Sequence, residues 1–153
     1  SINFVFAQTK TLMFVGTYTD GKPDKGIYVY ELNPTNGALS LVFNTENIVN
    51  PSFLTVSPDG KFLYASNRGT ENNIVIYKVN GRSGKLTLVG YQSTLGETPR
   101  NFTIDPTGNF LLVANQSSGN VVVFKRDTKT GLLSPTGETI NVPQPSCLKM
   151  IWK

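Results

Sequence analysis

The sequence predicts an all-β fold in which one short sheet recurs along the chain. Three observations support this prediction. The 153 residues contain an internal repeat, and each copy holds short β-prone segments separated by turn residues. No stretch shows the sustained period of about 3.6 residues that marks an amphipathic helix. With 39% apolar and 16% charged residues, the composition is that of an ordinary globular domain.

The repeat is clearest in two segments. Residues 51–68, PSFLTVSPDGKFLYASNR, align with residues 99–116, PRNFTIDPTGNFLLVANQ, at prolines and glycines as well as at apolar positions. Residues 73–90 align with residues 120–137, and both align with residues 26–43. The spacing of 47 or 48 residues falls within the range of about 40 to 50 that is typical of β-propeller blades. The chain therefore contains three copies.

One complete copy divides into four strands, which we name A to D. Strand A ends at the turn Pro58-Asp59-Gly60, and strand B is apolar on both faces, as in a strand buried on both sides. The four segments are Ser52–Ser57, Lys61–Asn67, Asn73–Val79 and Leu86–Gln92. Four short strands per repeat are typical of a propeller blade, whereas solenoid repeats are usually shorter or helical.

The copies are phased so that the first one lacks strand A. It holds Leu12–Tyr18, Gly26–Leu32 and Leu39–Asn44 as strands B to D, while the tail at residues 145–152 aligns with strand A. We expect this tail to complete the first blade by pairing with Leu12–Tyr18 of its own chain or of another copy, since that removes an exposed sheet edge. Cys147, on this apolar tail, is then expected to be buried.

The predicted organisation is one propeller-type domain at residues 11–153, preceded by a tail at residues 1–10. The three four-stranded antiparallel blades cover residues 11–46 with 145–152, residues 51–95, and residues 99–141. In the tail, Val5 and Ala7 fit the small residues before a secretory cleavage site, although an N-terminal strand or a frayed tail explains them too. A signal remnant would indicate a periplasmic or secreted protein, and its absence a cytoplasmic one.

Composition also excludes several kinds of site. With one Cys and no His, the chain cannot build an intrachain disulfide, a zinc site with His, or a Ser-His-Asp nucleophile. The net charge of +4 is scattered, and no apolar run approaches the roughly 20 residues of a membrane span, so we expect neither nucleic acid nor membrane as a partner. Asp20 and Asp24 lack the full pattern of a calcium loop and indicate a hairpin turn. Nothing requires a metal or a cofactor.

Two stretches carry a family resemblance. LMFVGTYTDGKPDKGIYVYELNPTNGALS, followed by NPSFLTVSPDGKFLYASN, resembles the first part of the seven-bladed propeller lactonases, the 6-phosphogluconolactonase and carboxymuconate-lactonising type. LYASNRGTENNIVIYKV and the later segment from GETPRNF to LLSPTG are similar to the last blades of that family. The resemblance covers residues 12–150 and implies that the beginning is joined to the end near Tyr64 to Asn67, with the middle blades absent.

Opening a lactone requires a group that stabilises the developing oxyanion and a base that activates water. Arg68 follows a strand B and Arg100 opens a strand A, both within family-like motifs, so we expect them to bind the anion unless they are solvated loop charges. Glu71 is the carboxylate nearest to Arg68 in sequence, and we take it as the candidate base, with a surface salt bridge as the alternative. Further substrate-binding candidates sit where strands B end and otherwise cap turns: Thr17, Tyr18, Asn67, Asn115 and Gln116. Arg82 and Arg126 are expected on the outer rim.

Two hypotheses for function follow. The first is a sugar-lactone hydrolase of the 6-phosphogluconolactonase type, acting on a small anionic lactone or acid. The second is a non-catalytic, shortened propeller module that assembles with itself into a closed ring. Because three blades are fewer than the usual four to eight, we expect a homodimer with six blades, or another oligomer that closes the ring.

Overall fold

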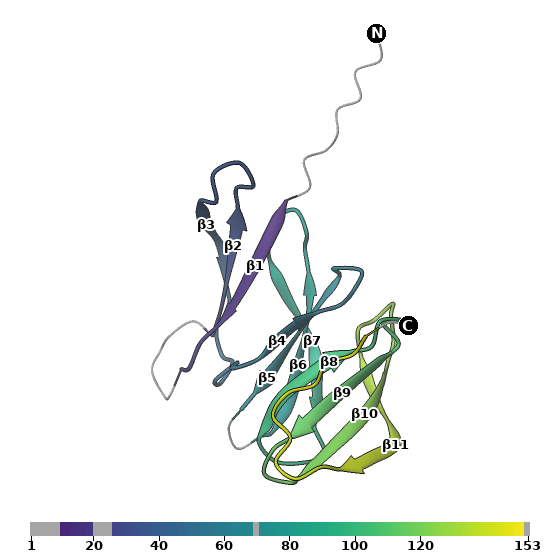
Figure 1. The fold of residues 1–153 in the computed structure, drawn as a ribbon. Coiled ribbons are helices and arrows are strands. Elements are labelled where there is room, and N and C mark those ends of the chain that lie inside the picture. The colour runs from purple at the N-terminus through teal and green to yellow at the C-terminus, as the bar shows by residue number, and fades with distance from the viewer. Residues whose placement is uncertain (1–9, 20–25, 69–70, 152–153) are drawn as a thin grey trace.

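The computed structural model describes residues 10–19, 26–68 and 71–151 (Figure 1), and in these ranges the chain forms strands and no helix. The strands form three antiparallel sheets in chain order, which confirms the all-β propeller prediction. Blade 1 has the order β1-β2-β3, blade 2 the order β4-β5-β6-β7, and blade 3 the order β8-β9-β10-β11. No helix that could cross a membrane is found in the part of the chain that the structure describes.

The strands lie where the repeat predicts them. Blade 1 contains β1 (Thr11–Gly16), β2 (Ile27–Leu32) and β3 (Leu39–Asn44). Blade 2 contains β4 (Leu54–Val56), β5 (Phe62–Asn67), β6 (Asn73–Val79) and β7 (Leu86–Ser93). Blade 3 contains β8 (Pro99–Ile104), β9 (Phe110–Asn115), β10 (Asn120–Arg126) and β11 (Leu133–Asn141).

The last two strands of each blade share an irregularity. The register shifts at Val29/Tyr30 in blade 1, at Ile76/Tyr77 in blade 2 and between Val122 and Phe124 in blade 3. A bulge at this point increases the local twist of the outer strands. Its recurrence at one place in the repeat shows that the copies share their backbone irregularities as well as their sequence pattern.

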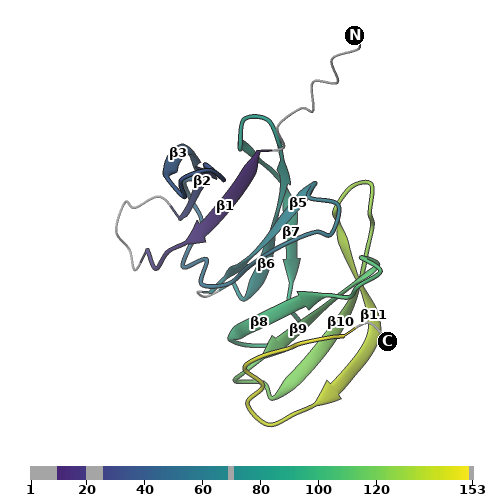
Figure 2. The same cartoon turned by 45° about the horizontal axis from the view of Figure 1, so that its top comes forward.

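The blades stack face to face, and each interface has its own apolar core (Figures 1 and 2). Between blades 1 and 2 the core is formed by side chains such as Ile27, Val29, Leu63 and Val75. Between blades 2 and 3 it includes Phe102, whose ring meets that of Phe53 edge to face at 4.9 Å and 79°. The middle blade is therefore covered on both faces, which is why β5 is buried along its whole length.

The tail does not complete blade 1 within this chain. Residues 144–151 form no strand, and Figures 1 and 2 show the yellow tail alongside β8. The Leu148 N–H donates a 2.8 Å hydrogen bond to Asn101 Oδ1 of β8. In the described structure the tail is therefore not paired with β1 of the same chain, because blade 2 stands between the tail and β1. The structure does not test pairing with another copy.

Cys147 is exposed, so the prediction that it is buried is wrong. In the repeat it corresponds to Phe53, which packs on the following blade. No following blade covers the tail in the described part of the chain. The signal-like residues Val5 and Ala7 and the hairpin at Asp20 and Asp24 lie outside the described residues.

Candidate functional site

Most of the predicted site residues lie at one end of the blades. Because neighbouring strands are antiparallel, the loops after β1, β5 and β9 and the loops before β4 and β8 lie at the same end, which we call the loop end. Tyr18, Arg68 and Gln116 are in the first group of loops, and Arg100 lies near the start of β8. The opposite end, which we call the turn end, carries the tight turns within each blade.

The structure brings Arg68 and Tyr18 together from two blades. Arg68 Nη1 donates to the Tyr18 hydroxyl at 3.5 Å. The main chain of Arg68 is also held in place, because its carbonyl oxygen accepts a 3.4 Å hydrogen bond from Asn50 Nδ2. Within the described residues Arg68 has no ion pair with a carboxylate. Its guanidinium therefore keeps donors available for an external anion.

Arg100 and Glu71 are not drawn into this contact. Arg100 is exposed, and Glu71 is exposed in the loop after β5. In the part of the chain that the structure describes, neither has an ion pair, and Glu71 has no hydrogen bond to Arg68. The role of Glu71 as a base stays a prediction.

Asn67 and Asn115 end β5 and β9, and both are buried. Asn67 lies opposite Asn73, and Asn115 lies opposite Asn120, at the same place in two blades. Asn115 Nδ2 donates to the Thr94 carbonyl oxygen at 3.0 Å, so this amide holds the loop before β8. That geometry fits the turn-capping alternative for Asn115.

Thr17 and Gln116 also have backbone roles. Thr17 donates to the Gly26 carbonyl oxygen through its N–H at 3.0 Å and its hydroxyl at 3.1 Å, which closes the loop between β1 and β2. The Gln116 N–H donates to the Thr98 carbonyl oxygen at 2.9 Å. The side chain of Gln116 is half-buried at the loop end and stays a candidate for substrate contact.

Sequence reasoning missed the asparagines that hold the loop end together. Asn50 Oδ1 accepts from the Thr19 N–H at 2.7 Å, and Asn72 Oδ1 accepts from the Thr98 N–H at 3.0 Å. Each bond ties a loop that leaves a strand B to a loop that enters a strand A. The signal was present at Asn50, because an asparagine before a proline favours a turn.

The residues that precede the three aligned prolines share one unusual conformation. Asn50, Thr98 and Gln144 have φ values of 45°, 57° and 48°, and they precede Pro51, Pro99 and Pro145. Residues other than Gly rarely adopt positive φ, because this backbone conformation is strained for them. The strain persists only where the surrounding structure fixes the conformation. The same turn therefore leads into β4, into β8 and into the tail.

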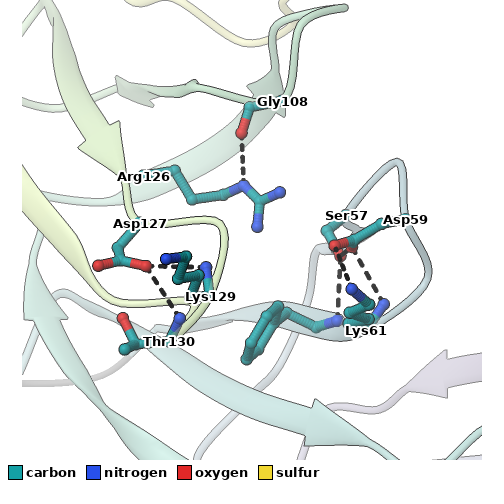
Figure 3. A network of polar contacts seen from close by, with 9 residues as sticks. Ser57, Asp59, Lys61, Gly108, Arg126, Asp127, Lys129 and Thr130 are labelled. Carbon is teal, nitrogen blue, oxygen red and sulfur yellow. Dashed lines mark hydrogen bonds and ion pairs between the residues drawn. The ribbon is translucent and has the colours of Figure 1, made fainter.

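The carboxylates with a perturbed pKa lie at the turn end instead, and Figure 3 shows Asp59 and Asp127 among them. Partial burial raises the pKa of Asp59, but hydrogen bonds from Ser57 Oγ at 2.6 Å and the Lys61 N–H at 3.2 Å outweigh it, helped by the charge of Arg126. The pKa of Asp59 is therefore below its ordinary value. Burial likewise raises the pKa of Asp105, and hydrogen bonds led by that of Thr107 bring it below the ordinary value. Each of these carboxylates accepts hydrogen bonds within its own turn and stabilises it.

Arg126 is not the rim charge that was expected. It is only 4% exposed, and its Nε donates to the Gly108 carbonyl oxygen at 2.6 Å (Figure 3). It ends β10 and lies under the turn between β8 and β9, whereas Arg82 lies exposed in the turn between β6 and β7. The expected location was wrong for Arg126 because alignment of the turns does not indicate which way a strand's last side chain points.

A cavity of about 550 Å³ lies at the turn end of blade 1, beside Lys10 and Glu31, far along the strands from the loop end. Across the residues that the structure describes, no cluster of three acidic, Cys or His side chains could hold a metal ion.

Comparison with known proteins places this geometry in a family. The family model "Lactonase, 7-bladed beta-propeller" matches residues 12–61 and residues 54–150. The two matches overlap at residues 54–61, just before the stretch where the sequence resemblance changes from the family's first part to its last blades. Such an overlap fits two parts of the family joined within one repeat.

Individual relatives are similar to this chain and support the family match. The chain is 55% identical over 96 residues to a 6-phosphogluconolactonase of Formosa agariphila, covering 62% of this chain and 27% of the relative. It is 43% identical over 100 residues to a 6-phosphogluconolactonase of Bacillus subtilis, covering 65% of this chain and 28% of the relative. The solved structure of the periplasmic gluconolactonase of Pseudomonas aeruginosa has a TM-score of 0.74 and 31% identity, covering 90% of this chain and 41% of that one.

The chain thus spans little more than a quarter of the length of these curated relatives. The family model nevertheless matches nearly all of it, in the same strands that form the three blades. This protein therefore belongs to the seven-bladed β-propeller lactonase family.

Proposed function

We propose that this chain binds a small anionic sugar lactone, or the acid formed from it, at the loop end. The observation that carries the proposal is the contact of Arg68 with Tyr18, which presents a guanidinium and a phenol side by side from two blades. Both are polar groups on an exposed surface, and the relatives named 6-phosphogluconolactonase supply the substrate class. Arg100, also at the loop end, is the second candidate for the anion.

Each group has a defined task in this proposal. A guanidinium binds phosphate or carboxylate through two parallel hydrogen bonds and stabilises an oxyanion that develops on the lactone carbonyl. Hydrolysis adds water across the ester bond and gives a carboxylic acid and a hydroxyl, and a proton is released at neutral pH. Glu71 is the proposed base that takes the proton from the attacking water.

The second candidate, a non-catalytic binding module, is favoured by a specific observation. Among the described residues Glu71 has no hydrogen bond or ion pair with Arg68, and the chain has no His to take its place. Without a positioned base the attacking water is not activated, so we expect hydrolysis of 6-phosphogluconolactone to be weak or absent while binding of the acid persists.

One pair of measurements tests both candidates. Proton release from 6-phosphogluconolactone and δ-gluconolactone, corrected for spontaneous opening, measures hydrolysis, and calorimetry with 6-phosphogluconate measures binding. Binding that is lost in Arg68→Ala and kept in Arg82→Ala, without hydrolysis, supports the binding module. Hydrolysis that disappears in Glu71→Gln supports the enzyme, and absence of both activities refutes the proposed function.

A further inference from the structure

The tail holds the position of a strand A on the free face of blade 3. Its Gln144 repeats the left-handed turn that precedes β4 and β8, and Pro145 is buried as Pro51 and Pro99 are. Leu148 is half-buried, and its N–H donates to Asn101 Oδ1. A strand A belongs to the blade that follows, so the tail takes the position of the innermost strand of a further blade.

Blade 1 has the complementary gap. In its order β1-β2-β3, β1 is the edge, while the matching strands β5 and β9 each pair with a strand A. Its side chains on the face away from blade 2 are exposed: Met13 and Val15 by 36% each, and Leu41 by 52%. An open edge beside an apolar face favours the addition of a strand.

The intact blades predict how the tail and β1 would pair. Leu54 lies opposite Ala65 in blade 2, and Phe102 lies opposite Val113 in blade 3. In the repeat alignment Leu148 is equivalent to Leu54 and Phe102, and Val15 is equivalent to their partners. Both pairs therefore place Leu148 opposite Val15. The same holds two residues further along, where Val56 lies opposite Leu63 and Ile104 lies opposite Leu111. The repeat alignment of these two pairs places Met150 opposite Met13. Met150 and Met13 are exposed by 37% and 36% here and would cover each other.

We propose that a second copy of this chain fills both gaps. The tail of each copy pairs with β1 of the other, so that blade 1 gains its fourth strand and packs on blade 3 of the partner. The tail cannot reach β1 of its own chain, because blade 2 lies between them. Two copies give six blades, which is within the usual range for closed propellers, and both junctions are alike, as a two-fold axis requires. This assembly does not depend on the proposed function.

The register gives a sharp test by cross-linking. In a Cys147→Ser background, Met13→Cys and Met150→Cys are made in separate chains, purified, mixed and oxidised. Directly opposed residues in antiparallel strands have Cβ atoms about 4.5–5.5 Å apart, close enough for a disulfide after small adjustment. We expect a disulfide-linked dimer in the mixture, at least five-fold above either protein alone. Lys149→Cys replaces Met150→Cys as the control, since its side chain points to the opposite face.

Light scattering on a size-exclusion column measures the assembly directly. We expect a dimer of the 16.7 kDa chain, and a monomer for Met13→Lys, which adds a charge to the edge at a position already partly exposed. Circular dichroism checks that this variant stays folded. A folded monomer of the unmodified chain, a larger closed oligomer, or no cross-link above the Lys149→Cys control would overturn the proposal.

Discussion

Arg68 Nη1 lies 3.5 Å from the hydroxyl oxygen of Tyr18, although 50 residues separate them in the sequence. The two side chains come from equivalent loops of adjacent blades, after β5 and after β1. Tyr18 is 59% exposed, so the pair lies open to solvent at the loop end. An exposed contact of this length adds little stability, and its importance lies in where it holds the guanidinium.

Arg68→Lys should weaken binding of 6-phosphogluconate by about 10-fold, because lysine keeps the charge but loses the planar pair of donors. Tyr18→Phe should weaken it by about 3-fold or less, since only the long hydrogen bond that orients the guanidinium is removed. Isothermal titration calorimetry measures both. The matched control is Arg82→Lys, at the turn end, and an equal loss in that variant would contradict the assignment.

Leu95→Asn should raise the free energy of unfolding by about 0.5–1 kcal/mol, because a left-handed backbone costs an ordinary side chain more than it costs asparagine. Leu95 has φ 55° and is 51% exposed, so the substitution removes little packing. The equivalent position of the preceding repeat already holds an asparagine, Asn47, at φ 60°. Thermal unfolding should show a Tm higher by about 2 °C. Leu88→Asn, exposed but on a strand, is the control and should not stabilise.

Gly96→Ala should destabilise the protein by about 2 kcal/mol or more, through overpacking at a buried side chain. A Cβ at Gly96 would lie 2.4 Å from Asn115 Nδ2 and 2.8 Å from Asn115 Cβ, and Asn115 is fully buried. Gly81→Ala, with nothing within 4 Å, is the control. Urea denaturation measures the effect. If Gly96→Ala costs as much stability in an Asn115→Ser background as in the unmodified chain, contact with the Asn115 amide is not the cause.

Tyr64→Phe should lower the free energy of unfolding at pH 7 by about 1 kcal/mol, since the Tyr64 hydroxyl donates to the Gly131 carbonyl oxygen at 2.8 Å. Tyr91→Phe, at an exposed position, should not.

Tyr64→Phe should also change how the free energy of unfolding depends on pH in alkaline solution. Burial raises the pKa of Tyr64 from 10.0 to about 12, and burial does the same for Tyr77, with a smaller contribution from Tyr91. Between these values the unfolded chain loses the proton first, so stability is complete below pH 10 and is lost as the pH rises toward 12. With Tyr64 removed, the fall between pH 10 and 12 should be shallower. An unchanged slope in urea titrations would show that Tyr64 does not contribute.

The sequence by itself determined the blades. The positions of the strands follow from the alternation of apolar and polar residues and from turn residues that accept only certain backbone angles. Both are local properties of the sequence, and they occur in all three copies of the repeat. For the same reason the missing strand A of blade 1 could be read from the alignment, and the loop-end location of Arg68, Tyr18 and Gln116 followed from strand order.

Only the tertiary structure decided what happens between blades. The packing of one sheet on the next decides whether Arg126 faces solvent or lies under the turn at Gly108. The same packing lets Asn50 connect Thr19 to the main chain of Arg68. The tail shows this most clearly: its sequence marks it as a strand A, but the place it occupies depends on which sheet face is within reach. That is a property of the stacked blades in three dimensions, because residues that meet across an interface are separated by a whole repeat and no local pattern encodes their distance.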